Sequence, residues 1–111
     1  MYIFGGHNNN VPIILNDVWK FDLTTNSWHF IDCDISPNPM YLVSATVVKD
    51  NMYVFGNHIS DKNALWQFNF ISQKWKNLIT NGNIPSSQAN QRICAFENSL
   101  LLLDSSKSNF E

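Results

Sequence analysis

The feature that most constrains the fold is a phrase that the sequence repeats at a nearly fixed spacing. The stretch NDVWKFDLTTNSWHFI begins at Asn16, and NALWQFNFISQKWKNL begins 47 residues later at Asn63. Upstream of these, MYIFGG at the start of the chain is matched by MYVFGN from Met52, at an offset of 51. A third, degraded copy reads FENSLLLLDS and aligns Asn98 with Asn51. Repeats of this length indicate a fold built by stacking equivalent supersecondary units.

Each unit has the composition of short β-strands. The complete unit contains four apolar segments rich in β-branched and aromatic residues, namely SATVVKD from Ser44, MYVFG from Met52, ALWQFNF from Ala64 and KWKNLI from Lys74. Within WQFNF, apolar and polar residues alternate, which places the aromatic rings on one face. We therefore predict an all-β fold without helices, with strands near 1–5, 17–22, 27–31, 43–49, 52–56, 65–70, 74–79, 92–97 and 99–103.

Four antiparallel strands in about 50 residues form one blade of a β-propeller. The repeated phrase resembles the kelch repeat, in which a strand ends in Gly-Gly, an aromatic–Asp pair follows, and a Trp stands six residues beyond the Asp. The first copy has Gly5-Gly6, Phe21-Asp22 and Trp28. The second has Gly56-Asn57, Phe68-Asn69 and Trp75, and the third has lost the motif at Leu103-Asp104. The lead-in to the complete unit keeps Pro39, but Met40 and Val43 replace the family's Arg and His.

The resemblance implies kelch-type blades of four antiparallel strands, about two and a quarter of them, as a fragment of a larger ring. In these terms residues 1–31 are strands 2–4 of a partial first blade, residues 32–79 a complete second blade, and residues 80–111 a partial, degenerate third blade. The outer strands of such a piece lack neighbours, so we expect self-association through open blade edges.

Charge and composition exclude several partners. A net charge of −2 and a pI near 5.8 provide no positive surface for nucleic acid or an anionic membrane. No apolar run approaches the 18 or more residues that span a bilayer. Cys33 and Cys94 are too few for a disulfide framework, so we expect free thiols in an intracellular, cytoplasmic setting.

The sequence holds no recognisable catalytic or cofactor motif. It lacks Gly-x-Ser-x-Gly, Ser-x-x-Lys and a glycine-rich phosphate loop, and Asp32 and Asp34 have no apolar setting that would separate their pKa values. His7 and His58 occupy equivalent positions, which could suggest a metal, but no carboxylate or cysteine accompanies both at ligand spacing. We therefore predict no catalytic residues, no metal and no cofactor.

The long connections between strands 2 and 3 of each unit are the expected binding surface. They run over 7–15 and 58–62, differ in length, and lie opposite the short polar turns. The blade-to-blade connections over 32–39 and 80–89 are expected on the same face. The hypothesis is a kelch-type interaction module, a scaffold or adaptor for a protein partner, with contact residues His7, Ile13, Ile14, His58 and Asp61. An alternative for the apolar residues of the first loop is that they pack onto the blade.

A second functional hypothesis is that the chain is the propeller portion of an enzyme. The example behind this hypothesis is galactose oxidase, which carries a copper site on a propeller of this kind. Its paired Tyr and His ligands have no match at Tyr2, Tyr41 or Tyr53.

Overall fold

The computed structural model is built from β-strands that form three antiparallel sheets. It describes residues 1–8, 13–58, 61–82 and 91–104, and no helix occurs within these ranges. The strands are β1 (Tyr2–Asn8), β2 (Ile13–Asp22), β3 (Ser27–Ile31), β4 (Tyr41–Val48), β5 (Asn51–His58), β6 (Asp61–Asn69), β7 (Lys74–Asn77), β8 (Gln91–Phe96) and β9 (Ser99–Asp104). The all-β prediction is confirmed.

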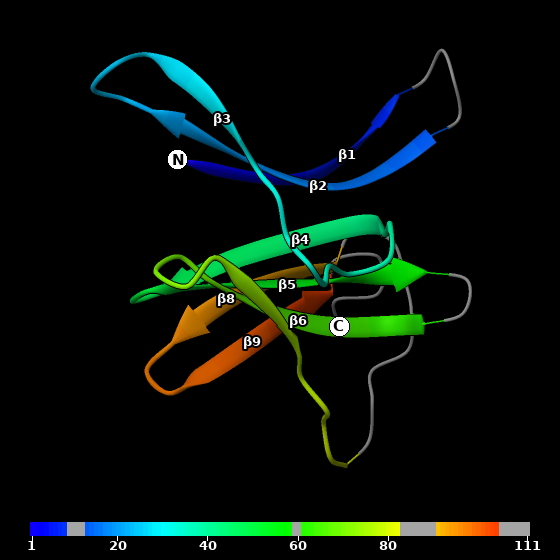
Figure 1. The fold of residues 1–111 in the computed structure, drawn as a ribbon. Coiled ribbons are helices and arrows are strands. Elements are labelled where there is room, and N and C mark those ends of the chain that lie inside the picture. Colours follow the sequence, from blue (N-terminus) through cyan, green and yellow to red (C-terminus); the bar gives the residue numbers. More distant parts are fainter. Residues whose placement is uncertain (9–12, 59–60, 83–90, 105–111) are drawn as a thin grey trace.

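The three sheets stack as layers (Figure 1). The first has the order β1-β2-β3, the second β4-β5-β6-β7, and the third β8-β9. The second sheet is the complete four-stranded unit and lies between the other two, with the first sheet on one of its faces and β8 against β4 on the other. This is the arrangement of successive propeller blades, seen here as three, four and two strands.

The hairpins between strands 2 and 3 of each unit are longer than the sequence predicts. The expected loop over 7–15 is mostly paired strand, because β1 and β2 continue through His7 opposite Ile14 and Asn8 opposite Ile13. Likewise β5 continues to His58, which pairs with Asp61 at the start of β6. The prediction that all these residues lie in loops was wrong, since backbone pairing extends past the glycines. Residues 9–12 and 59–60 lie outside the described part of the chain.

Gly5 makes this extension possible. The register of β1 and β2 shifts between Phe4 and Gly6, so the chain forms a bulge there. Gly5 has φ of 72°, and a Cβ on it would stand 3.0 Å from the carbonyl oxygen of Leu15. Only glycine adopts this conformation so close to another backbone without strain.

The turns repeat in conformation as well as in sequence. Lys49 and Glu97, which each open a two-residue turn, have φ of 53° and 54°. The third copy is therefore aligned with the second at an offset of 48, not the 47 that Asn98 and Asn51 suggest. With this corrected register Leu100 and Leu102 match Met52 and Val54, which are core residues.

Short polar side chains cap the turn after strand 3 of the first two units. The Asp22 carboxylate accepts hydrogen bonds from the N–H groups of Thr24 at 2.8 Å and Thr25 at 3.4 Å. The Asn69 side-chain oxygen accepts the same pair of bonds from Ile71 at 3.0 Å and Ser72 at 2.8 Å. The bond from Thr24 is the main reason that the pKa of Asp22 lies below its ordinary value.

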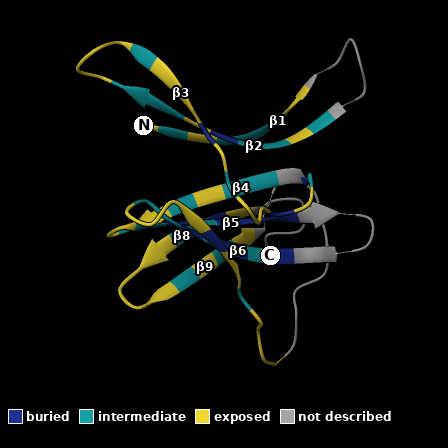
Figure 2. Cartoon of the chain, viewed as in Figure 1, coloured by how far each residue is buried: buried dark blue, intermediate teal, exposed yellow. Residues whose placement is uncertain are grey.

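The core lies between the first and second sheets (Figure 2). Tyr2 stacks on Phe70 with ring centroids 4.5 Å apart, and Phe4 meets the edge of Trp75 at 5.0 Å. The residues beneath these rings are the alternating aromatics of β6, with Trp66 and Phe68 buried. A blade in this chain therefore obtains its core from the neighbouring sheet rather than from within itself.

Candidate functional site

A hollow opens between β1 and the inner strands of the second sheet. Its volume is about 520 Å³. One wall consists of Tyr2, Phe4, Gly6 and His7 of β1 with Ile14 of β2, and the other of Met40, Val43, Ala45 and Met52. We call this hollow the edge pocket, because β1 is the outermost strand of its sheet.

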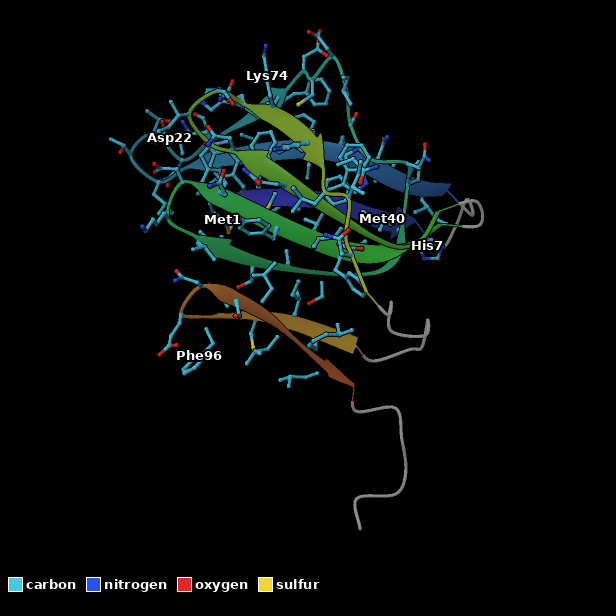
Figure 3. All side chains as sticks on the ribbon, turned by 90° about the horizontal axis from the view of Figure 1, so that it is seen from below. Met1, His7, Asp22, Met40, Lys74 and Phe96 are labelled. Carbon is cyan, nitrogen blue, oxygen red and sulfur yellow. The ribbon has the colours of Figure 1, made fainter. Side chains whose placement is uncertain are left out.

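Two of the predicted contact residues line the edge pocket. His7 is exposed and stands opposite the half-buried Ile14 in the register of β1 and β2. Figure 3 shows His7 and Met40 at the same end of the molecule, away from Met1 and Asp22. Ile13 pairs with Asn8 at the end of the same hairpin, but its side chain lies outside the described residues. The alternative that Ile14 packs onto the blade is thus partly realised, since its half-buried side chain forms a pocket wall.

The other two predicted residues belong to a different hairpin. His58 and Asp61 pair with each other where β5 and β6 meet, and their side chains are outside the described part. The end at which β1 leads into β2 and the end at which β5 leads into β6 point to the same side of the molecule (Figure 1). The five residues therefore share one end of the fold but belong to two separate hairpins.

The opposite wall of the edge pocket was missed by sequence reasoning. Met40, which replaces the family's Arg in the lead-in, is only 4% exposed and belongs to the core. Val43 and Ala45 were assigned to a strand, but nothing in their sequence indicates that they face a cavity. One expectation from the sequence could have indicated the pocket. The first strand was expected to lack a neighbour, and an open strand edge beside a packed face leaves a hollow.

The pocket walls are predominantly apolar. His7 and the Tyr2 hydroxyl are the only side-chain polar groups among the described lining residues. Within the described ranges no three His, Cys, Asp or Glu side chains gather as they would around a metal ion. This lining suits an uncharged, apolar segment with a few hydrogen-bonding groups better than a charged ligand.

A second hollow lies at the opposite end of the strands, between the second and third sheets. It has a volume of about 400 Å³ and is lined by the two tight turns and the strand residues beside them, including Lys49, Tyr53 and Glu97. Its lining includes the positively charged Lys49 and the negatively charged Glu97, so it is more polar than the edge pocket. The short turns thus frame a polar hollow, and the long hairpins an apolar one.

The thiols have no disulfide partner, as predicted. Cys33 and Cys94 are both free and half-buried. The Cys33 sulfur donates to the carbonyls of Ile31 at 3.8 Å and Gln73 at 3.7 Å. Partial burial, together with the neighbouring Asp32 and Asp34 carboxylates, raises the pKa of the Cys33 thiol.

Comparison with known proteins identifies the repeat. The family model described as the KLHDC2/KLHL20/DRC7 Kelch-repeats domain matches residues 1–106. The chain belongs to the kelch-repeat family. Kelch repeats are generally protein-interaction modules. No helix in the described residues is long and apolar enough to cross a membrane.

Individual relatives agree with this assignment. The chain is 40% identical over 57 residues to Kelch domain-containing protein 10 homolog of Drosophila melanogaster, covering 50% of this chain and 9% of that protein. Kelch domain-containing protein 3 of Homo sapiens is also 40% identical over 57 residues, covering 50% and 15%. Host cell factor 2 of Homo sapiens is 31% identical over 103 residues, covering 76% and 13%. The chain therefore spans only a small part of the length of these relatives.

Proposed function

We propose that this chain is part of a kelch-repeat interaction module that binds a protein partner through the end formed by the β1-β2 and β5-β6 hairpins. The proposed contact residues are His7, Ile13, Ile14, His58 and Asp61. The observation that carries the proposal is that His7 and Ile14, which pair across β1 and β2, both line the first wall of the edge pocket. A cytoplasmic, non-enzymatic scaffold or adaptor role fits this arrangement, in which residues are placed to contact rather than to react.

The chemistry of the surface supports a protein partner. An apolar hollow with a single imidazole at its rim offers area for hydrophobic burial and few groups that fix a small charged ligand. Loops and hairpin ends that differ while the strands repeat are common positions for binding residues. The two hairpins differ in this way, because the first connection is longer than the second.

The test is capture of the natural partner by the intact protein carrying Ile13→Ser and Ile14→Ser. We expect the amount of captured partner to fall at least about tenfold, as for loss of two apolar contacts at an interface centre. Lys49→Ala is the matched control, because Lys49 lies at the opposite end in an exposed turn. Asn51 does not serve as a control, since its side-chain oxygen accepts bonds from Gln67 and Asn69. Undiminished capture by the double variant, with loss on Lys49→Ala, would place the contact surface at the turn end instead.

A further inference from the structure

The connection that leads from the second sheet to the third contains the one Asn-Gly pair of the sequence, Asn81-Gly82. The side-chain amide of an asparagine can react with the backbone nitrogen of the next residue, which is one reason why asparagine is a chemically labile residue. A glycine in the next position favours this reaction, because it has no Cβ to hinder the approach of its nitrogen. The pair is therefore a candidate site of spontaneous covalent modification.

The fold leaves this pair accessible. Both residues are exposed, and they follow β7 in a segment, yellow in Figure 1, that extends away from the three sheets. Among the described residues neither Asn81 nor Gly82 has a hydrogen-bond partner. A Cβ placed on Gly82 would meet no atom within 4 Å, so the space around this residue is open.

The equivalent connection of the first unit shows that this exposure belongs to the repeat. The offset of 47 that matches Trp28 with Trp75 also matches Asp34 with Asn81. Asp34 is exposed although the next sheet lies beside it, since it lines a small hollow together with Lys74 and Trp75 of β7. A following sheet therefore does not cover this position. The same comparison shows that the position accepts a carboxylate.

We propose that Asn81 is a site of spontaneous deamidation through a succinimide formed with Gly82. The Gly82 nitrogen loses its proton and bonds to Asn81 Cγ, the bond between Cγ and Nδ2 breaks, and ammonia leaves. Water then opens the ring at either of its carbonyls, which gives aspartate or isoaspartate. Each product adds one negative charge to the connection, and isoaspartate also lengthens the main chain by one carbon atom. The proposal is independent of the proposed function, because it requires no partner.

Two Asn-Ser pairs, Asn26-Ser27 and Asn98-Ser99, are internal controls. Ser27 pairs with Asp22 and Ser99 with Phe96, so a strand ladder holds the backbone that follows each of these asparagines. Serine also carries a Cβ, which hinders the attacking nitrogen. Both features should slow the reaction at these positions relative to Asn81.

The test is peptide mapping by mass spectrometry after incubation of the intact protein at neutral pH, with aspartate and isoaspartate products separated by chromatography. Asn81 should convert at least about tenfold faster than Asn26 and Asn98, and both isomers should form. In urea the rate at Asn81 should stay within about threefold of its rate in the folded chain, because the fold does not hold this pair. An Asn81 that stays unchanged, aspartate as the sole product, or a folded rate more than about tenfold below the rate in urea would overturn the proposal.

Two variants separate the effect of the fold from that of the dipeptide. Gly82→Ala adds a Cβ in open space and should slow conversion of Asn81 at least about tenfold. Ser99→Gly creates a second Asn-Gly pair inside a hairpin, and its Asn98 should react at least about tenfold more slowly than Asn81 in the folded chain but at a similar rate in urea. Equal rates at Asn81 and Asn98 in the folded Ser99→Gly variant would overturn the inference that the fold selects Asn81.

Discussion

The first and second sheets carry the same aromatic face in two different settings. In the second sheet Trp66 and Trp75 are 9% and 6% exposed, while their counterparts in the first, Trp19 and Trp28, are 37% and 49% exposed. The paired rings have nearly the same geometry, with centroids 5.0 Å apart for Phe68–Trp75 and 4.8 Å for Phe21–Trp28. The local structure of the two sheets is therefore nearly the same. Their tryptophans differ in exposure because the first sheet covers the aromatic face of the second.

This difference shows at which level each property of the fold is decided. Strand formation, turn conformation and cross-strand ring pairing follow from the repeated phrase and recur in both sheets. Burial requires a neighbouring sheet that presents rings such as Tyr2 and Phe4. Each repeat unit thus encodes one side of an interface between sheets, and stability depends on the stacking of units.

The two sheets also differ in how the indole N–H groups are satisfied. Trp19 Nε1 donates to the Asp17 carboxylate at 2.8 Å. The residue equivalent to Asp17 in the second copy is Ala64, and the buried Trp66 Nε1 has no hydrogen-bond partner. The exposed ring therefore keeps a polar contact while the buried one relies on packing alone. The apolar cover must outweigh the cost of an unpaired donor in the second sheet.

Truncating the equivalent tryptophans gives the largest expected contrast. Trp75→Ala removes contacts with Phe4, Phe68 and Trp66 and should lower the free energy of unfolding by about 3–5 kcal/mol. Trp28→Ala removes a ring that is half-exposed, and the loss should be about 1 kcal/mol. Urea unfolding followed by circular dichroism measures both. Equal losses would mean that the first sheet is covered in solution.

Exposed rings on the first sheet should promote self-association. Trp28 and Phe30 are 49% and 53% exposed on one face, together with Ile3 and Trp19. The double change Trp28→Ser with Phe30→Ser should lower the weight-average mass in sedimentation velocity toward that of a monomer. Ile71→Ser with Ile79→Ser is the matched control, because these residues are 77% and 92% exposed but isolated outside the aromatic face. An equal fall in both pairs would indicate general stickiness rather than a specific face.

Much of the fold could be predicted because the repeat reports it directly. Alternation in the phrase from Trp66 to Phe70 predicted the strand and its buried face. The predicted register of the third copy was wrong by one residue. The prediction matched Asn98 with Asn51, whereas the backbone conformation of the turns at Lys49 and Glu97 gives an offset of 48. Hairpin length was also wrong, since pairing beyond Gly5 depends on a bulge.

The candidate site was less predictable from sequence. His7 and Ile14 were named because they belong to the long connection between strands 2 and 3, and they do line a hollow. The opposite wall comes from residues about 30 to 40 positions further along, whose placement depends on how two sheets stack. Whether His58 and Asp61 contribute is still a prediction.

The turn caps offer a smaller, pH-dependent contrast between the copies. The pKa of Asp22 in the folded chain lies below its ordinary value of 3.8, so the ionised carboxylate favours the fold above that pH. This contribution is lost as the pH falls through the lower, folded pKa. Asp22→Asn, which copies Asn69, should melt slightly lower than the parent near neutral pH, and the gap should close in acid. Scanning calorimetry at several pH values checks this, and a gap that does not change with pH would exclude the carboxylate as its cause.

The central claim is that one repeated phrase is covered in the second sheet and open in the first. The four indole N–H resonances of a ¹⁵N-labelled sample, broadened by a soluble gadolinium chelate at low protein concentration, test it without altering the chain. We predict that the Trp19 and Trp28 signals broaden strongly while those of Trp66 and Trp75 persist, in accord with their exposed fractions. Equal broadening within the pairs Trp19/Trp66 and Trp28/Trp75 would contradict the account, because it would mean that the first sheet does not cover the second.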